Sequence, residues 1–269
     1  MAWACVVAQC RRMTRNYDLH VLTLAQVVAL LRVEGSWPGP IALSSGWFRA
    51  RARPWNEVVS DPMVRLERGG SDFLGTVSHT LAEMGTGTIY SPALYPASTG
   101  VWRRSGFEDF SALDVMERLL PGAPPPETGE TRLETSPDWA AIIEVDRQAF
   151  GGFWGMSIDG LAEAHETNKS TALFVVDGPN GHDAYAIVGA QWGTVYLHRI
   201  AVRPGASGTG LGAALLSAAI AWGTRTGGRT MVLNVRPDNT RAKRLYRRFA
   251  FADTGTSLLV LRHSTQRSV

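Results

Sequence analysis

Three glycines at alternate positions constrain this sequence more than any other feature. Gly208, Gly210 and Gly212 lie between an apolar run typical of a strand, TVYLHRIAV, and an alanine-rich run typical of a helix, LGAALLSAAIAWGTRTGG. A tight turn that needs one residue at positive φ is satisfied by one glycine. Three of them indicate instead that a ligand approaches the backbone closely where the helix begins.

The start of a helix favours anions. Its first N–H groups have no partner inside the helix, and the helix dipole adds a partial positive charge. Between Arg199 and Arg248 the chain has ten Lys and Arg residues but a single acid, Asp238, and such a region attracts a polyanion. The glycine loop, residues 207–212, is therefore predicted to bind phosphate groups.

Two other phosphate-binding motifs fit this loop poorly. A P-loop ends in Gly-Lys-Ser or Gly-Lys-Thr, and neither follows Gly212. A Rossmann fingerprint is matched formally by Gly208, Gly210 and Ala213, but it expects an acid at the end of the next strand, and that strand, TMVLNV, ends in Asn-Val. Fewer than 60 residues follow the loop, which is too few for the second half of a dinucleotide site.

A segment rich in proline and glycine, PGAPPPETGET, divides the chain and is predicted to be an extended linker. We therefore expect three parts: a unit over residues 13–120, the linker 121–131 and a unit over residues 132–269. Met13 begins a helix-forming segment, and residues 1–12 are expected to be an extension outside the fold. The cysteines are confined to this leader, at Cys5 and Cys10, so neither a disulfide framework nor a metal site is expected.

No apolar run reaches the ~18 residues of a membrane span, and the basic residues follow the apolar leader rather than precede it. The composition, with 45% hydrophobic and 19% charged residues, suits a globular protein, and we expect a cytoplasmic location with no membrane partner.

In the second unit, periodicity predicts a regular succession of elements. A helix is expected over 138–150, with Ser136 as its N-cap and Pro137 at its first position, and a second helix follows Ser157. The later elements are strands over 171–177, 183–191 and 194–202, a helix over 211–228, a strand over 230–235, a helix over 239–249 and a strand over 256–263.

With this order of elements, residues 132–269 resemble the GCN5-related N-acetyltransferases, the GNAT family. That family carries Gln/Arg-x-x-Gly-x-Gly/Ala after its fourth strand, and Gly210 and Gly212 of SGTGLG occupy the glycine positions. Its second landmark is an Asn followed seven residues later by a Tyr, matched by Asn239 and Tyr246. The resemblance implies an α/β fold whose central sheet is mixed, mostly antiparallel and flanked by helices, and it implies acetyl-CoA (coenzyme A) as acetyl donor.

The resemblance also implies roles for single residues. Tyr246 would protonate the leaving thiolate as general acid, since a phenol of pKa near 10 is protonated at neutral pH, and an N–H such as that of Val202 would stabilise the oxyanion. The cofactor-binding positions would be Ile200, Ala201 and Val202 along the pantetheine arm, Ser207, Gly208, Thr209, Gly210, Leu211 and Gly212 at the pyrophosphate, and Asn239.

The group that takes a proton from the acceptor amine stays open at this level. His198 is the most suitable by pKa, while Glu144, Asp146 and a water relay are alternatives. Alternation along the strand decides whether the side chain of His198 faces the cofactor.

Two positions depart from the family pattern. Ser207 replaces the Gln or Arg that opens the loop signature, so one phosphate contact is lost or supplied by another base such as Arg203 or Arg241. Ala250 stands where a glycine usually ends the last helix, and an alanine in a left-handed conformation there costs about 1 kcal/mol.

The first unit resembles the second at an offset of 144 residues. VWRRSGFEDFSALDVMERL from Val101 aligns with LYRRFAFADTGTSLLVLRH from Leu245, which indicates an internal duplication. The first copy has Trp102 in place of Tyr246, Tyr95 in place of Asn239 and no alternating glycines. We expect a degenerate, truncated GNAT-like domain that covers or shapes the acceptor site.

The expected function is N-acetyl transfer from acetyl-CoA to a primary amine of a small molecule or peptide by direct attack. Phe150, Phe153 and Trp154 are candidates for the wall of an acceptor pocket of apolar character, although aromatics flanked by glycines more often serve as packing anchors. A catalytically silent coenzyme A-binding module, and an acetyltransferase for charged RNA or a protein N-terminus, are the alternatives. Nucleic acid is not the expected partner, and a homodimer and the acyl chain length are left open.

Overall fold

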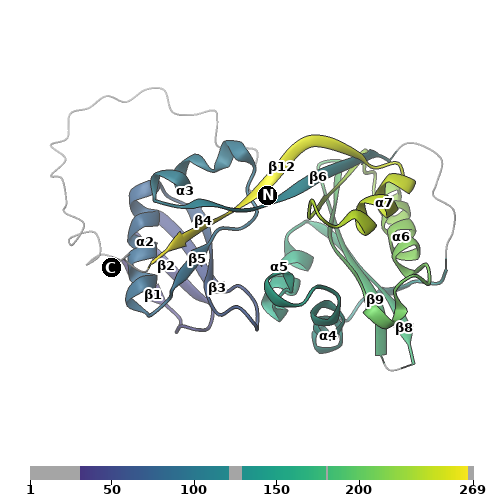
Figure 1. Cartoon of the computed structure of the whole chain (residues 1–269), viewed down its shortest axis with the longest axis horizontal. Helices are drawn as coiled ribbons and strands as arrows, with labels where there is room; N and C mark the ends of the chain where they lie inside the picture. The colour runs from purple at the N-terminus through teal and green to yellow at the C-terminus, as the bar shows by residue number, and fades with distance from the viewer. Residues whose placement is uncertain (1–30, 121–128, 180, 266–269) are drawn as a thin grey trace.

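The computed structural model describes residues 31–120, 129–179 and 181–265. The predictions for residues 1–12, for the helix after Met13 and for most of the linker lie outside these residues. Within them, the strands form one twelve-stranded sheet in the order β1-β2-β3-β4-β5-β12-β6-β11-β10-β9-β8-β7 (Figure 1). The strands are β1 (Arg32–Glu34), β2 (Ile41–Ser45), β3 (Phe48–Pro54), β4 (Pro62–Arg68), β5 (Thr88–Tyr90), β6 (Glu108–Leu119), β7 (Arg132–Glu134), β8 (Ser170–Gly178), β9 (Gly181–Gln191), β10 (Thr194–Val202), β11 (Thr230–Val235) and β12 (Ala252–Ser264).

The two halves of the chain exchange their last strands. β6 follows the first half but pairs with β11, whereas β12 follows the second half and reaches β5. β6 and β12 pair with each other in antiparallel fashion and bridge the halves in Figure 1. A shift of 144 residues converts the pair Leu113↔Leu258 into the neighbouring pair Asp114↔Ser257. An approximate two-fold axis therefore passes between these pairs, as expected for a duplicated unit.

In the second half, the sheet lies between two helical layers. Residues of β8 alternate between them: Ala172 and Phe174 belong to the core under α6 and α7, and Leu173 and Val175 to the core under α4 and α5. None of the described helices is long and apolar enough to cross a membrane. The helices are α2 (Ser71–Glu83), α3 (Gly100–Arg104), α4 (Trp139–Phe150), α5 (Ile158–Glu166), α6 (Leu211–Arg225) and α7 (Thr240–Arg248), with short 3-10 turns η1 (Pro96–Ser98), η2 (Gly152–Trp154) and η3 (Pro204–Ala206).

The first half has its own core, formed where α2 and α3 cover the sheet. Leu43, Val64 and Phe73 are among its buried residues, and so is Leu261 of β12, which comes from the other end of the chain. Because each half contributes a strand to the sheet of the other, burial of apolar surface joins the halves into one folded body.

Helix ends follow local chemistry, with one correction. The N-cap of α4 is Asp138, not Ser136: its Oδ1 accepts hydrogen bonds from Ala140 N (3.0 Å) and Ala141 N (3.1 Å). A carboxylate two residues nearer the helix reaches these N–H groups, whereas the N–H of Ser136 donates to Glu134. The predicted cap of α5, Ser157, is confirmed.

The alanine that follows the last helix is strained as predicted. Ala250 has φ +59°, in the left-handed region, and its N–H donates to the carbonyl of Arg247 (3.0 Å). Glycine would adopt this conformation at less cost.

Candidate active site

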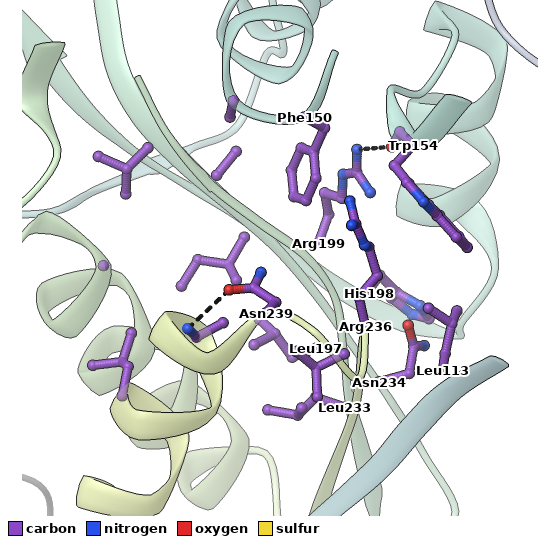
Figure 2. Close-up of a pocket in the computed structure, with 18 of the residues that line it drawn as sticks. Leu113, Phe150, Trp154, Leu197, His198, Arg199, Leu233, Asn234, Arg236 and Asn239 are labelled. Atoms are coloured by element: carbon purple, nitrogen blue, oxygen red, sulfur yellow. Dashed lines mark hydrogen bonds between the residues drawn. The ribbon is translucent and has the colours of Figure 1, made fainter. Parts of the chain in front are cut away.

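A cavity of about 920 Å³ opens where two parallel strands separate. β10 pairs with β11 only from Thr194 to Leu197, and beyond this point β10 keeps its partner β9 alone. Residues at the carboxyl ends of both strands line the cavity, among them His198 and Asn234 (Figure 2). The glycine loop lines it as well. Strand separation thus exposes one edge of β10 to a ligand.

The free edge of β10 follows from its hydrogen-bonding pattern. Arg203 N donates to Asp183 O (2.8 Å), so alternation along an antiparallel pair turns the N–H and C=O groups of Ile200 and Val202 away from β9. Both residues line the cavity. Ala201 also lines it, but its side chain is buried and its backbone groups point toward β9.

The glycine loop has the conformation that an anion requires. Gly208 and Gly210 lie at φ +97° and +94°, and α6 begins directly afterwards at Leu211. Within the described residues, the N–H groups of Gly208, Gly210, Leu211 and Gly212 have no backbone acceptor. A Cβ at Gly210 would meet nothing within 4 Å, so the loop combines open space with N–H groups that have no backbone acceptor. A phosphate group fits this loop.

Arginines surround the same end of the cavity. Arg241, Arg244 and Arg248 of α7 line it, and an Arg241 guanidinium nitrogen lies 3.9 Å from the Cβ position of Gly208. Arg203 points elsewhere, because its Nε donates to His182 O (2.5 Å). Of the two bases considered for the contact missing at Ser207, Arg241 is therefore the one in reach.

The loop residues are not equivalent. Ser207, Gly208, Gly210, Leu211 and Gly212 line the main cavity. Thr209 does not: its hydroxyl donates to Ala206 O (2.7 Å), and the residue lines a small neighbouring hollow.

Tyr246 and Asn239 both lie on the cavity wall. Tyr246 is 5% exposed, and burial raises the pKa of its phenol to about 12, so the hydroxyl keeps its proton at neutral pH. Asn239 is the N-cap of α7, because its Oδ1 accepts from Ala242 N (3.0 Å; Figure 2). Asn239 therefore fixes where α7 begins, and the seven-residue spacing then sets the position of the Tyr246 phenol on that helix.

His198 occupies a bulge in β10. Leu197 pairs with Val188 and Arg199 with Ile187, leaving His198 without an opposite residue. The imidazole lines the cavity and lies 2.5 Å, Nε2 to Oδ1, from Asn168. Burial lowers its pKa to about 4, so the ring is neutral at pH 7 and too weakly basic to hold a proton taken from an amine.

Asp146 is buried and fully engaged. Its carboxylate accepts from both Arg199 Nε (2.7 Å) and Nη2 (2.9 Å), from Tyr185 Oη (2.5 Å) and from Met156 N (2.8 Å). Arg199 Nη2 also donates to the carbonyl of Trp154 (2.7 Å; Figure 2). This ion pair ties β10 to the loop after α4, and it leaves no lone pair of Asp146 for proton transfer.

Glu144, the other carboxylate considered as base, lies on the exposed side of α4. It accepts hydrogen bonds from Arg147 and Gln148 and is absent from the cavity wall. The lining of the cavity contains no Asp or Glu at all among the described residues.

The aromatic residues after α4 divide into two sets. Phe150 and Trp154 line the cavity, as predicted. Phe153 does not: it stacks on Trp55 of the first half with ring centroids 4.3 Å apart and contacts Tyr90 and Phe110. It anchors the loop to the first half rather than walling a pocket.

The first half reaches the cavity through residues that the sequence analysis did not select. Asn56 holds the loop after α4 by donating to Gly152 O (2.9 Å) and Gly155 O (2.8 Å). The lining residues from this half are Arg53, Trp55, Met63, Pro92, Ala93 and Leu113. No local motif marks them, because they meet the cavity only when the halves pack together.

Residues 139–251 match the model of the Acetyltransferase (GNAT) family. Two curated relatives are both named Mycothiol acetyltransferase. The one from Actinosynnema mirum is 29% identical over 218 residues, covering 73% of this chain and 70% of the relative. The one from Geodermatophilus obscurus is 28% identical over 180 residues, covering 58% and 57%.

Solved structures share the architecture over both halves. A GCN5-related N-acetyltransferase from Sphaerobacter thermophilus superposes with a TM-score of 0.53 at 18% identity, covering 86% of this chain and 82% of the other. A tandem GNAT protein from the clavulanic acid biosynthesis pathway gives 0.55 at 13%, covering 89% and 85%. The predicted α/β fold, with a mixed sheet flanked by helices, is confirmed.

Proposed function

We propose that this chain, whose residues 139–251 match the model of the Acetyltransferase (GNAT) family, transfers the acetyl group of acetyl-CoA to a primary amine of a small molecule or peptide. The observation that carries the proposal is the glycine loop. Its unpaired N–H groups, the open space at Gly210 and the nearby arginines lie on the same cavity as Tyr246. Acetyl-CoA, when bound, supplies an activated acetyl thioester.

Each part of the cavity is assigned a task. Residues 207–212 and Arg241 hold the pyrophosphate, with Thr209 serving through its backbone alone. The edge groups of Ile200 and Val202 hold the pantetheine arm, which resembles an added strand. The N–H of Val202 stabilises negative charge on the acetyl oxygen, while Ala201 and Asn239 shape the wall.

A proton moves at Tyr246, and a hydrogen bond forms at His198. The Tyr246 hydroxyl donates a proton to the leaving sulfur, and solvent restores it afterwards. His198 accepts a hydrogen bond from the acceptor amine without retaining the proton, because its pKa is about 4. The amine therefore enters uncharged, and the proton that it loses passes to water.

Replacing Tyr246 with phenylalanine tests the general acid. We expect kcat to fall about a hundredfold, the lower range for general acid catalysis, with an unchanged Kd for acetyl-CoA by titration calorimetry. Tyr196→Phe, on β10 but outside the cavity lining, should behave as wild type. A Tyr246→Phe enzyme with normal kcat would remove this residue from the chemistry, and a wild type that binds but never transfers would indicate a silent coenzyme A-binding module.

The pH profile tests both protonation states together. His198, with its pKa lowered to about 4, is neutral above about pH 5, and Tyr246, with its pKa raised to about 12, is protonated below about pH 11. Between these limits kcat/KM for the acceptor should rise with pH only as the amine loses its proton, and then level off at the pKa of the amine. An inflection near 6.5 that persists with amines of different pKa would contradict the neutral imidazole.

A small-molecule acceptor is the version we favour. Two relatives carry the name Mycothiol acetyltransferase, and the cavity is closed on one side by residues of the first half, including Arg53 and Trp55. We retain the proposed division of the chain into a first unit, 13–120, a linker, 121–131, and a second unit, 132–269. The two units exchange their last strands, β6 and β12. In this view the first unit serves as a wall of the acceptor site.

A further inference from the structure

Gly189 is a glycine that its backbone conformation does not require. It lies inside β9, is buried, and its φ is not positive. A Cβ there would lie 2.1 Å from the Oδ1 and 2.7 Å from the Cγ of Asn168. Glycine within a strand weakens it and often marks the close approach of another group. Here that group is the Asn168 amide, and β9 has no side chain at the position where this amide lies.

The amide of Asn168 is held between two partners. Its Nδ2 donates to Gln191 Oε1 (3.3 Å), and its Oδ1 lies 2.5 Å from His198 Nε2. Since the amide oxygen only accepts, Nε2 of the imidazole carries the proton and donates it. Nδ1 is then the acceptor of the neutral ring, and within the described residues it has no hydrogen-bond partner.

His198 therefore separates Asn168 from the cavity. The imidazole lines the cavity, whereas Asn168 and Gln191 do not. The bulge in β10 gives the ring freedom that regular pairing would remove, so a neighbouring group has to set its orientation. The cavity lining of the described residues has no carboxylate, and this ring nitrogen is a basic hydrogen-bond acceptor that the cavity offers to an amine.

We propose that Asn168, seated against Gly189 and oriented by Gln191, is a positioning residue that fixes His198 as the Nε2–H tautomer and so presents Nδ1 to the N–H of the acceptor amine. This inference rests on the proposed acetyl transfer and adds a residue to it. Asn168 itself touches no substrate. No proton leaves the ring, because the Nε2 proton stays hydrogen-bonded to Asn168 Oδ1 while Nδ1 only accepts a hydrogen bond.

The test reads the tautomer directly in the free protein. Ring ¹⁵N chemical shifts from long-range ¹H–¹⁵N NMR should show His198 with the proton on Nε2 in wild type. Asn168→Leu keeps the side-chain shape but removes the acceptor, so the shifts should move toward a mixture of tautomers. Asn168→Asp restores an oxygen at the same place and should restore the single tautomer.

A second variant leaves both residues in place. Gly189→Ala puts a methyl group where the amide lies and should expel it, giving the same NMR result as Asn168→Leu. Gly75→Ala, where a Cβ would meet nothing within 4 Å, is the matched control and should leave the shifts unchanged. Thermal unfolding of every variant shows whether the fold persists.

Kinetics connect the tautomer to transfer. With the best acceptor from a panel of glycinamide, glucosamine, spermidine and tyramine, Asn168→Leu and Gly189→Ala should lower kcat about ten- to a hundredfold, as misplacement of a contact group does, with KM for acetyl-CoA unchanged. Asn168→Asp should regain most of the loss.

The outcomes separate the two levels of the proposal. The role of Asn168 is overturned if the wild-type ring carries its proton on Nδ1. It is also overturned if Asn168→Leu and Gly189→Ala both leave the tautomer, or both leave kcat, unchanged. The proposed acetyl transfer stands in each of these cases. A different outcome is a protein that shows the expected tautomer and binds acetyl-CoA but transfers acetyl to none of these amines. That outcome overturns the proposed function, and with it the contact between Nδ1 and the amine.

Discussion

Replacing Gly210 with glutamate should abolish detectable acetyl-CoA binding by titration calorimetry. The residue lies at φ +94° with open space around its Cβ position, so the new side chain enters the volume assigned to the pyrophosphate. It places a carboxylate against phosphate, and like charges in contact cost several kcal/mol. Together with ~1 kcal/mol of backbone strain, this predicts a loss of more than about a hundredfold in affinity.

Gly85→Glu is the matched control for this variant. Gly85 has φ +86°, and its Cβ position also has nothing within 4 Å, but it follows α2 in the first half. The same backbone strain and the same charge are introduced away from the cavity, so binding should persist. Equal loss in both variants would trace the effect to folding, and unimpaired binding by Gly210→Glu would remove the glycine loop from the cofactor site.

Replacing Asp146 with alanine should destabilise the protein by about 3–5 kcal/mol, the usual cost of leaving one partner of a buried ion pair without the other. The carboxylate is 0% exposed, and the side chain of Arg199 is 14% exposed. The substitution also leaves Tyr185 Oη and Met156 N without their acceptor. Chemical unfolding monitored by tryptophan fluorescence measures the change in free energy.

Asp253→Ala breaks an exposed pair, Arg247–Asp253 at 2.9 Å, and should leave stability unchanged because solvent screens such pairs. A double variant, Asp146→Leu with Arg199→Met, removes both buried charges and should recover much of the loss. If Asp146→Ala unfolds at the wild-type denaturant concentration, the ion pair does not hold β10 to the loop after α4.

Much of the second half was predictable because its signals are local. Strands Thr194–Val202 and Thr230–Val235 have the bounds that their apolar runs predicted, and Ser157 caps α5. The glycine spacing and the Asn239–Tyr246 spacing placed the loop and the phenol on one cavity. Each of these signals acts within one or two turns of chain, where φ/ψ preference and helix periodicity operate.

Two residues of the predicted site lie in surroundings that the sequence did not reveal. His198 was the best base by its ordinary pKa, but its burial lowers that pKa to about 4, and it lies in a bulge of β10. Alternation along the strand could not reveal the bulge, because a register shift depends on the partner strand. Phe153 was a candidate for a pocket wall, whereas it stacks on Trp55, almost a hundred residues earlier in the chain.

The sequence by itself determined most elements of the second half, the glycine loop, the Asn-Tyr pair and the similarity of the two halves, because these depend on residues close together in the chain or on direct comparison of its two halves. Only the tertiary structure decided that β6 and β12 change places and that Asp146 forms an ion pair with Arg199. It also decided that Asn168, seated against Gly189, contacts His198, and that the first half forms one side of the cavity. These features depend on burial, strand register and charge pairing between residues that are distant in the sequence and that only packing brings together.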